Sequence, residues 1–273
     1  MVYQLISLDM DGTLLDNDLK ISNENISAIH QAALQNKYVV IATGRSLSEM
    51  NPYMERLKDI RYFILESGAV IFDRLKNKMI YQKYFEKNAV EQIIKISYKQ
   101  DLMPHYFTGG HSYSFTEKMM HMDKYNMAKF QDFYLENVRK IIDFNEFKEK
   151  YSDKIEKIIF YHQSIQEMDL CYQYLHDIAI EKPTVGISIE MSPQGVNKAS
   201  ALKMLCQILD ISLNRTIAIG DSDNDLEILN QVGLAIAVEN ANENVKNICN
   251  EIVKDNHHHG VAQAIKKYLL VDD

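Results

Sequence analysis

Two aspartates, Asp9 and Asp11, stand directly after a short apolar segment near the start of the chain and are followed by Gly12-Thr13. The segment has the length and composition of a buried strand, and Gly12 allows the backbone to turn away from it. Ligands in open α/β sheets bind at the carboxyl ends of strands, where a carboxylate can act as a nucleophile or as a general acid and base. The alternative interpretation of so short a motif is a solvated turn after an edge strand.

Polar groups follow two further apolar runs in the same way. Thr43 follows one β-branched run, and Asp221, Asn224 and Asp225 follow another. Because the carboxyl ends of parallel strands meet at one edge of a sheet, we expect these side chains to lie near Asp9. Carboxylates placed so close together cannot all ionise without a cation, and Mg²⁺ takes oxygen ligands while keeping waters and substrate phosphate in its shell. The sequence therefore predicts a magnesium site.

The acidic run 221–225 has two competing interpretations. The first is a cluster of helix N-caps, where acidic side chains are favoured by the helix dipole. The second is a calcium-binding EF-hand loop, but Leu226 and Val232 occupy the positions at which that loop needs Gly and Glu, so we reject it.

Lys198 opens a predicted helix after the polar sequence 192–197. A lysine in the first turn of a helix is disfavoured by the helix dipole, which indicates another partner for its charge. The alternative is a solvated surface lysine, since most lysines are exposed.

The elements that must position these residues follow from the hydrophobic patterns. Up to residue 81 and again from residue 191, short apolar strands alternate with helical patterns, as in a parallel sheet covered by helices. Between these segments the alternation stops, and helices mix with short strands. We therefore predict an α/β fold in which residues 1–81 and 191–273 form a doubly wound, Rossmann-like catalytic core with a parallel sheet, and residues 82–190 form an inserted, smaller α+β cap domain.

The same patterns predict the individual elements. The expected strands are 38–41, 62–65, 70–72, 79–81, 103–108, 112–115, 155–161, 185–189, 216–219 and 234–238. The first expected helix starts at Ser22, which is its candidate N-cap. A second follows residues 42–46 and runs to about Leu57, and another follows the acidic run 221–225 and runs through Leu229. The other expected helices cover 89–99, 165–180, 198–209, 244–248 and 261–269.

Composition limits the classes of protein to consider. A chain of 273 residues, 46% of them hydrophobic, is long enough for two domains. The formal net charge of −8 argues against a nucleic-acid surface, which needs clustered Lys and Arg, but is compatible with a small phosphorylated substrate.

Three scattered cysteines, Cys171, Cys206 and Cys249, are typical of reduced thiols rather than a disulfide framework. No signal-peptide pattern is visible, and no apolar run approaches the ~20 residues that cross a bilayer. We expect a cytoplasmic protein, monomeric or weakly homodimeric, with neither a membrane nor a nucleic-acid partner.

Four motifs, taken in order, resemble those of the haloacid dehalogenase (HAD) superfamily. Within it they are similar to the Cof-like phosphatases of type IIB, which carry a large C2 cap between the second and third motifs. The motifs are Asp9-Met10-Asp11-Gly12-Thr13-Leu14-Leu15, Ala42-Thr43-Gly44-Arg45, Ser192-Pro193-Gln194-Gly195-Val196-Asn197-Lys198 and Gly220-Asp221-Ser222-Asp223-Asn224-Asp225.

The resemblance implies a role for each matching residue. Asp9 is the nucleophile, Asp11 the general acid and base, Thr43 the phosphate-binding hydroxyl, and Lys198 the cation that steadies the phosphoryl group. The implied cofactor is Mg²⁺. Its implied ligands are Asp9, Asp221, Asp225 and Asp11, the last through its backbone carbonyl. The implied substrate-binding residues are Gly44, Arg45, Ser67, Gly68 and Asn224.

The sequence departs from the family pattern in two places. Glu66-Ser67-Gly68-Ala69 stands where the family more often has Asn-Gly-Ala, so that Ser67 replaces an amide. The loop Asn256–Gly260 carries His257-His258-His259 where acidic residues are commoner. Neither departure touches the implied nucleophile or metal ligands.

In the cap, polarity and position make His105, Tyr106, His111 and Tyr113 candidate specificity residues.

The function implied is a magnesium-dependent phosphatase that hydrolyses small phosphorylated metabolites, with sugar phosphates favoured, through an aspartyl-phosphate. A phosphomutase or phosphotransferase would use the same intermediate, and the motifs do not separate these activities. A non-catalytic protein that binds phosphorylated ligands is a further alternative, although Asp9 and Asp11 are both present. A receiver-type signalling module is disfavoured by the length of the chain and by the position of Asp9 on the first strand.

Overall fold

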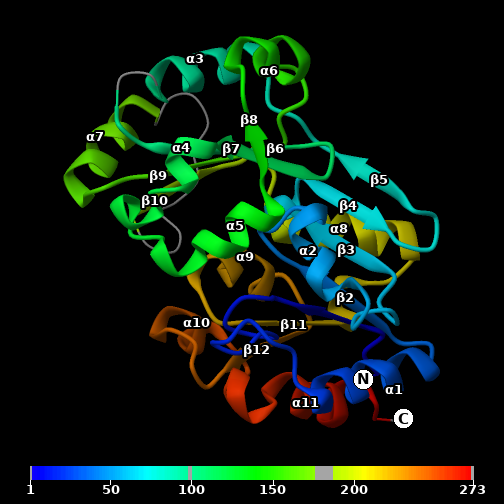
Figure 1. Cartoon of the computed structure of the whole chain (residues 1–273). Helices are drawn as coiled ribbons and strands as arrows, with labels where there is room; N and C mark the ends of the chain where they lie inside the picture. The colour runs from blue at the N-terminus through cyan, green and yellow to red at the C-terminus, as the bar shows by residue number, and fades with distance from the viewer. Residues whose placement is uncertain (1, 98–99, 176–186, 272–273) are drawn as a thin grey trace. The chain divides into compact units, whose positions relative to one another are not determined.

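The computed structural model describes residues 2–97, 100–175 and 187–271, which belong to two compact units (Figure 1). The first unit contains Met1–Gly44, Tyr53–Tyr81 and Asn197–Asp273, and the second contains Arg45–Pro52 and Gln82–Val196. Each unit has its own sheet.

These units differ from the predicted domains at two segments. Residues 45–52 and 191–196 were assigned to the core by their position in the sequence, but they cluster with the second unit. For residues 45–52 the reason is a set of hydrogen bonds to the second sheet, among them one from the backbone N–H of Ser48 to the carbonyl of Gly110 (2.9 Å).

The first unit is built on an eight-stranded sheet in the order β13-β12-β11-β1-β2-β3-β4-β5. The six strands from β13 to β3 are parallel, and β4 pairs antiparallel with β3. The strands are β1 (Leu5–Leu8), β2 (Tyr38–Ala42), β3 (Tyr62–Leu65), β4 (Val70–Asp73), β5 (Lys78–Gln82), β11 (Thr216–Gly220), β12 (Leu234–Val238) and β13 (Glu251–Val253). Their apolar, β-branched composition suits burial on both faces, and the predicted doubly wound sheet is confirmed.

Helices cover both faces of this sheet (Figure 1). On one face α1 (Asn23–Leu34) packs against α11 (Gly260–Ala264). On the other, α8 (Lys198–Leu209), α9 (Leu226–Leu229) and α10 (Glu243–Ile248) form a continuous layer. As predicted, Ser22 caps α1, its hydroxyl accepting a hydrogen bond from the N–H of Asn25.

The second unit has a five-stranded sheet in the order β10-β9-β6-β7-β8. Its strands are β6 (Met103–Thr108), β7 (His111–Phe115), β8 (Arg139–Ile141), β9 (Lys157–Tyr161) and β10 (Ser188–Met191). Its helices are α2 (Leu47–Met54, of which the last two residues belong to the first unit), α3 (Lys87–Ser97), α4 (Thr116–Met119), α5 (Gln131–Asn137), α6 (Phe144–Tyr151) and α7 (Ile165–Leu175).

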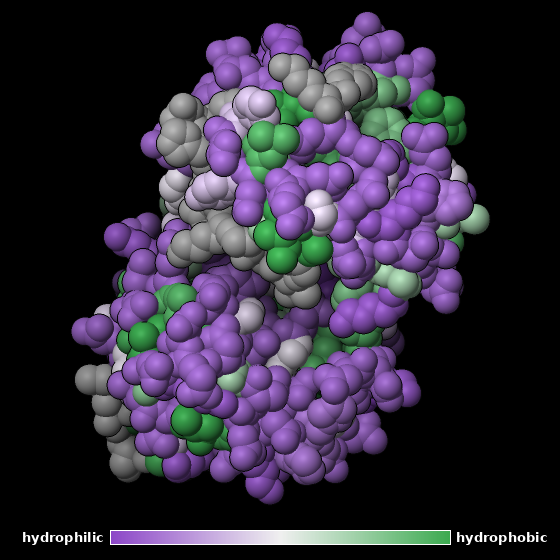
Figure 2. All heavy atoms as spheres, turned by 90° about the vertical axis from the view of Figure 1, so that its left-hand side faces the viewer, coloured by the Kyte–Doolittle hydropathy of each residue, from purple (hydrophilic) through white to green (hydrophobic). Residues whose placement is uncertain are grey.

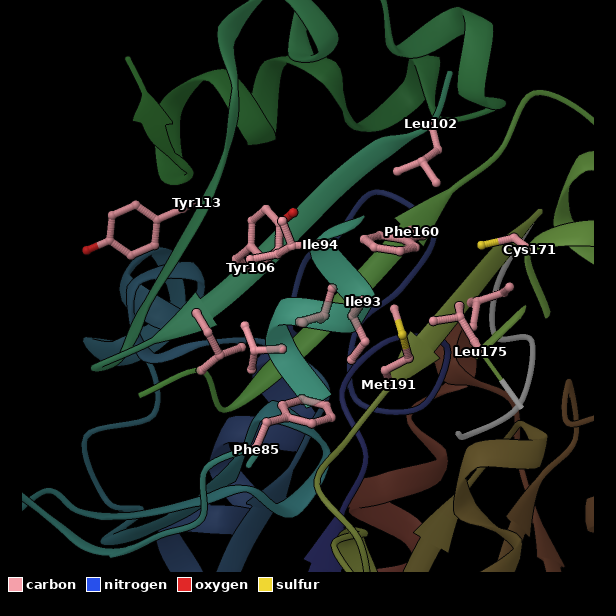
Figure 3. Packing of buried hydrophobic residues seen from close by; sticks show 14 of the residues in the cluster. Phe85, Ile93, Ile94, Leu102, Tyr106, Tyr113, Phe160, Cys171, Leu175 and Met191 are labelled. Atoms are coloured by element: carbon pink, nitrogen blue, oxygen red, sulfur yellow. The ribbon is translucent and has the colours of Figure 1, made fainter. Parts of the chain in front are cut away.

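Alternation along the strands of this second sheet divides its core into two clusters. Figure 3 shows one of them, in which Tyr106 and Phe160 from the sheet meet Ile93 of α3 and Leu175 of α7. The other cluster contains Met119, Met122 and Met127, which pack beside Phe107 and Tyr161. The methionine-rich segment is therefore largely core, consistent with the adaptable packing of methionine.

Most predicted elements are confirmed in the part of the chain that the structure describes. The strand 234–238 and the helix 198–209 have the predicted bounds. The short strands β8 and β13 and the helices α4, α5 and α6 were not predicted. The predicted helices 89–99 and 165–180 and the strand 185–189 each extend onto residues outside the described ranges.

None of the helices in the described residues is long and apolar enough to cross a membrane. Figure 2 shows one face of the molecule, on which hydrophilic residues predominate and the hydrophobic patches are small and separated.

Candidate active site

The strand register of the first unit brings the predicted catalytic residues to one edge of the sheet. Leu8 at the end of β1 pairs with Ile219 of β11 on one side and with Ile41 of β2 on the other. Asp9 therefore follows β1 between the strand ends that precede Asp221 and Thr43. The backbone N–H of Asp9 donates to the carbonyl of Ile219 (3.1 Å), which extends the ladder to the nucleophile candidate.

Three carboxylates and one ammonium form the centre of the site. Asp9, Asp221 and Asp225 each offer a carboxylate oxygen within 4.8 Å of the others. The Nζ atom of Lys198 donates to Oδ1 of Asp9 (2.6 Å) and to Oδ1 of Asp225 (2.7 Å). Lys198, Asp9 and Asp225 are buried. The structure thus brings together four residues from three distant parts of the sequence.

The protonation of this cluster follows from burial and from the mutual charges. Burial raises the pKa of Asp9 well above its usual range, Lys198 opposes that shift, and Asp225 and Asp221 add to it. Burial, followed by the charge of Asp225, raises the pKa of Asp221 to about 6. Burial acts to lower the pKa of Lys198, but Asp225 and Asp9 outweigh it, so its pKa is raised and the ammonium stays charged.

Helix α8 holds Lys198 in place from its first turn. Asn197 is the N-cap, and its side chain accepts from the N–H of Ser200 (2.7 Å) while the Ser200 hydroxyl accepts from the N–H of Asn197 (3.1 Å). This capping box fixes the start of the helix. The predicted anionic partners of Lys198 are thereby identified as Asp9 and Asp225, and the alternative of a solvated surface lysine is wrong.

Asp221 and Asp225 lie on a tight turn after β11. Oδ2 of Asp225 accepts from the backbone N–H of Asp221 (3.1 Å), and Oδ1 of Asp221 accepts from the hydroxyl of Thr13 (3.1 Å). Gly220 leaves room for this turn, because a Cβ atom there would lie 2.4 Å from Oδ2 of Asp225. The acids partly cap a short helical turn, as the competing interpretation held, but their side chains also form the carboxylate cluster.

Thr43 lies at the end of β2, beside an unusual turn after β3. The N–H of Ser67 donates to the carbonyl of Thr43 (3.0 Å). Glu66, Ser67 and Gly68 have φ angles of 54°, 56° and 105°, three consecutive residues in the left-handed region. A Cβ atom at Gly68 would lie 2.2 Å from the carbonyl oxygen of Asn197, so glycine permits the close approach of this turn to the start of α8.

Two predicted site residues, Asp11 and Asn224, have exposed side chains, unlike the buried residues of the carboxylate cluster. The side chain of Asp11 is exposed and does not belong to the carboxylate cluster, so the prediction of a metal ligand rests on its backbone carbonyl. Asn224 is also exposed, and its Oδ1 accepts from the hydroxyl of Ser222 (2.9 Å).

Comparison with known proteins decides the family. The family model of haloacid dehalogenase-like hydrolases matches residues 6–265. The chain belongs to this family. The curated relatives of this HAD hydrolase include a 5-amino-6-(5-phospho-D-ribitylamino)uracil phosphatase of Bacillus subtilis, 28% identical over 98% of this chain and 96% of the relative. Another is an HMP-PP phosphatase of Serratia proteamaculans, 25% identical over 98% and 94%.

Solved structures agree with this family. A haloacid dehalogenase-like hydrolase from B. subtilis is 27% identical, with a TM-score of 0.84 over 96% of this chain and 99% of that chain. A HAD subclass IIB sugar phosphatase, BT4131, has a TM-score of 0.83 over 98% and 100% at 19% identity, a likeness in fold. The predicted α/β fold and the predicted enzyme class, a HAD-like hydrolase, are confirmed.

Sequence reasoning missed two asparagines that brace the loop after β1 in this hydrolase. Asn240 donates through Nδ2 to the carbonyl of Gly12 (2.8 Å) and accepts through Oδ1 from the N–H of Asn256 (3.1 Å). Asn256 in turn donates through Nδ2 to the carbonyl of Leu15 (2.8 Å). Asparagines in loops are common, and no spacing in the sequence indicates these partners.

The candidate specificity residues of the cap are mostly core residues of the second unit. Tyr106 and Tyr113 are buried and belong to the cluster of Figure 3, and His105 is also buried. Only His111 is partly exposed. Alternation along β6 and β7 divides these residues between the two faces of the sheet, so they do not form one group.

The histidine tract makes surface contacts. His258 pairs with Asp255 (2.8 Å), and His259 lies 3.7 Å from Glu24. Among the described residues, none of the three histidines belongs to a group of potential metal ligands.

Proposed function

We propose that this HAD hydrolase is a magnesium-dependent phosphatase that acts on small phosphorylated metabolites through an aspartyl-phosphate on Asp9. The observation that carries the proposal is the buried contact between Lys198 and Asp9, at 2.6 Å, inside a cluster of three carboxylates. Burying a carboxylate with a cation beside it costs desolvation free energy, and such groups with shifted pKa values are concentrated at functional sites.

The residues present fit a magnesium ion. Asp9, Asp221 and Asp225 supply the hard oxygen ligands that Mg²⁺ prefers, and the raised pKa values of Asp9 and Asp221 record like-charge crowding and burial that a cation would relieve. The backbone carbonyl of Asp11 is the fourth proposed ligand. When bound, Mg²⁺ supplies positive charge that offsets the charge of the transferring phosphoryl group.

In the first step a carboxylate oxygen of Asp9 attacks phosphorus, the ester P–O bond breaks, and the leaving oxygen takes a proton from Asp11. In the second step Asp11 accepts a proton from water as that water attacks phosphorus. The acyl-phosphate bond breaks, inorganic phosphate leaves and Asp9 is regenerated. Lys198 and the hydroxyl of Thr43 hold the phosphoryl oxygens throughout, because positioning and charge account for most catalysis of phosphoryl transfer.

The remaining predicted contacts concern the substrate. Its phosphate is held by residues of three loops, Gly44 with Arg45, Ser67 with Gly68, and Asn224. We propose sugar phosphates as the substrate class, in line with the phosphorylated ribityl compound named for one relative. The second unit is the proposed cap, which would exclude water and select the substrate. The enzyme is expected to act in the cytoplasm as a monomer or a weak homodimer.

The test is phosphate release by the purified protein from a panel of phosphorylated metabolites, with Mg²⁺ or with EDTA. Asp9→Asn is the test variant, and Asp18→Asn, an exposed aspartate nine positions later, is the matched control. Release that needs Mg²⁺, survives in Asp18→Asn and disappears in Asp9→Asn supports the proposal. Release that persists in Asp9→Asn contradicts it, and transfer of phosphate to an added alcohol in place of water would identify a phosphotransferase.

A further inference from the structure

Glu49 places a buried carboxylate in the first turn of α2, within the second unit. Its Oε2 accepts from the backbone N–H of Ser46 (2.8 Å), and its Oε1 accepts from the hydroxyl of Ser112 on β7 (2.8 Å). Nε2 of the buried His105 on β6 lies 3.4 Å from the same Oε1. We call Ser46, Glu49, His105 and Ser112 the Glu49 cluster.

Half of this arrangement has a simple structural explanation. The bond from the Ser46 N–H, with the longer return bond from the Glu49 N–H to the Ser46 hydroxyl (3.4 Å), is a capping box at the start of α2. A capping box uses one carboxylate oxygen and is normally solvated. Here the whole side chain is buried, and the second oxygen is bonded to a strand more than sixty residues away.

The cluster is not a pair of opposite charges. Burial raises the pKa of Glu49, and burial together with the nearby charge of Lys157 lowers the pKa of His105 to about 3. The imidazole is therefore neutral, and hydrogen bonds rather than an ion pair hold Glu49. Glutamine matches glutamate in shape. Its amide oxygen can accept from the N–H of Ser46, and its amide N–H can donate to the hydroxyl of Ser112, which reverses the direction of that bond.

Two further contacts hold the same segment to the second unit. The N–H of Ser48 donates to the carbonyl of Gly110 in the turn between β6 and β7 (2.9 Å). The guanidinium of Arg45 stacks over the ring of Phe133 on α5, 4.9 Å from its centroid. Arg45–Pro52 is thus tied to the second unit at the strands β6 and β7 and at α5.

The location of this segment in the chain gives the ties a functional meaning. The first segment of the first unit ends at Gly44, one residue after Thr43, and the first segment of the second unit begins at Arg45. Arg45, the proposed substrate-binding residue, therefore belongs to the same unit as Glu49 and Ser112. The position of Arg45 is set by the unit that holds Glu49.

We propose that Glu49 is a positioning residue, which holds Arg45–Pro52 against the strands β6 and β7 of the second unit and thereby fixes the position of Arg45. The inference rests on the proposed function, because Arg45 is there a substrate-binding residue. Loss of Glu49 then weakens substrate binding through Arg45 and leaves the chemistry at Asp9 intact.

The test is a set of kinetic measurements with the most active phosphate ester of the panel. Glu49→Ala removes both bonds of the carboxylate, and Ser112→Ala removes only the bond to β7. Glu49→Gln keeps the bond from Ser46 and can bond Ser112 with the amide as donor. Glu55→Ala, an exposed glutamate of the same region, is the matched control. Each of the first three is also made with Arg45→Ala, and the binding of inorganic phosphate and the melting temperature are measured for all.

We expect Glu49→Ala to raise KM about tenfold with kcat within about twofold, and Ser112→Ala to raise KM about threefold, since one net hydrogen bond is at stake in the latter. Glu49→Gln should restore wild-type values, and in the Arg45→Ala background Glu49→Ala and Ser112→Ala should have no further effect on KM. A helix-capping role alone would lower the melting temperature of Glu49→Ala, leave Ser112→Ala unchanged and give effects that add to that of Arg45→Ala. That pattern overturns the inference.

Ser112→Ala serves as the test if Glu49→Ala does not fold. If the wild-type protein releases no phosphate from any ester, the proposed function fails by itself. The inference is then decided by the affinity for inorganic phosphate, which should fall in Glu49→Ala and Ser112→Ala only when Arg45 is present. An unchanged affinity in both variants overturns it.

Discussion

Gly12 and Asp221 approach each other so closely that a Cβ atom on residue 12 would lie 2.5 Å from Oδ2 of Asp221. Gly12 also has a φ angle of +82°, in the region that side chains with a Cβ atom rarely adopt. The loop after β1 can therefore reach the carboxylate cluster only with glycine at this position.

We expect Gly12→Ala to displace Asp221, which would lower kcat at least tenfold and the free energy of unfolding by about 1–3 kcal/mol. Gly109→Ala is the matched control, because Gly109 has a positive φ of 60° and no heavy atom within 4 Å of its added Cβ. Gly109→Ala should lose stability because alanine is strained at a positive φ, as in Gly12→Ala, but it should keep the wild-type activity. Equal activity of the two variants, measured by phosphate release, would contradict the prediction.

Removal of the Lys198 ammonium should lower both the stability of the protein and its catalytic activity. Lys198→Met leaves Asp9 and Asp225 buried without their cation, so we expect the free energy of unfolding in EDTA to fall by about 3–5 kcal/mol. Activity should fall by about 10²–10³. Urea unfolding measures the first effect. Lys203→Met, an exposed position on the same helix, should change stability by less than about 0.5 kcal/mol.

The raised pKa of Asp221 predicts how the metal-free protein responds to pH. The pKa is about 6 in the folded state and close to 3.9 in the unfolded state, so between these values the folded state holds the additional proton. The contribution of Asp221 to stability therefore falls as pH rises from about 4 to about 6, by on the order of 3 kcal/mol.

Asp221→Asn removes this contribution. In EDTA the variant should be more stable than the wild type at pH 7, and the difference between them should shrink towards pH 4. Its affinity for Mg²⁺ should be lower, because a carboxylate ligand is lost. Urea unfolding at pH 4.5 and pH 7, with Asp18→Asn as the control, checks the first result. The same difference at both pH values would show that Asp221 does not titrate in this range.

Asn240 should control the geometry of the nucleophile loop. Asn240→Ala loses the bonds to Gly12 and Asn256, so we expect a loss of about 1–2 kcal/mol in stability and about a tenfold lower kcat. Asn230→Ala, which removes an exposed side chain bonded to the carbonyl of Leu226 in the preceding helix α9, should leave kcat unchanged. An equal kcat in both variants would show that the brace has no role in catalysis.

The position of the carboxylate cluster could be predicted from the sequence because strand periodicity and parallel pairing decide it. Once β1 and β11 are recognised as neighbouring buried strands, Asp9 and Asp221 must follow them at the same edge. The charge of Lys198 in the first turn of a helix was a second usable signal, because it conflicts with the helix dipole.

Contacts between distant segments could not be predicted in this way. The capping box of Ser46 and Glu49 is readable from their spacing, but nothing in the pattern indicates that Ser112 binds the other oxygen of Glu49. The prediction of Tyr106 as a specificity residue rested on the polarity of tyrosine. The structure shows that this side chain packs in the core of the second unit, through contacts with distant segments that the sequence pattern does not indicate. The strand β13 has only three residues, too few for a period to be visible.

The central position of β1 also has a consequence for biosynthesis. One edge of β1 pairs with β2 soon after both strands leave the ribosome, but the other edge waits for β11, which is synthesised after the whole second unit. At about 5–20 residues per second that delay is on the order of ten seconds. During this time the nascent chain carries an apolar strand with an unpaired edge, a site for chaperone binding or for aggregation.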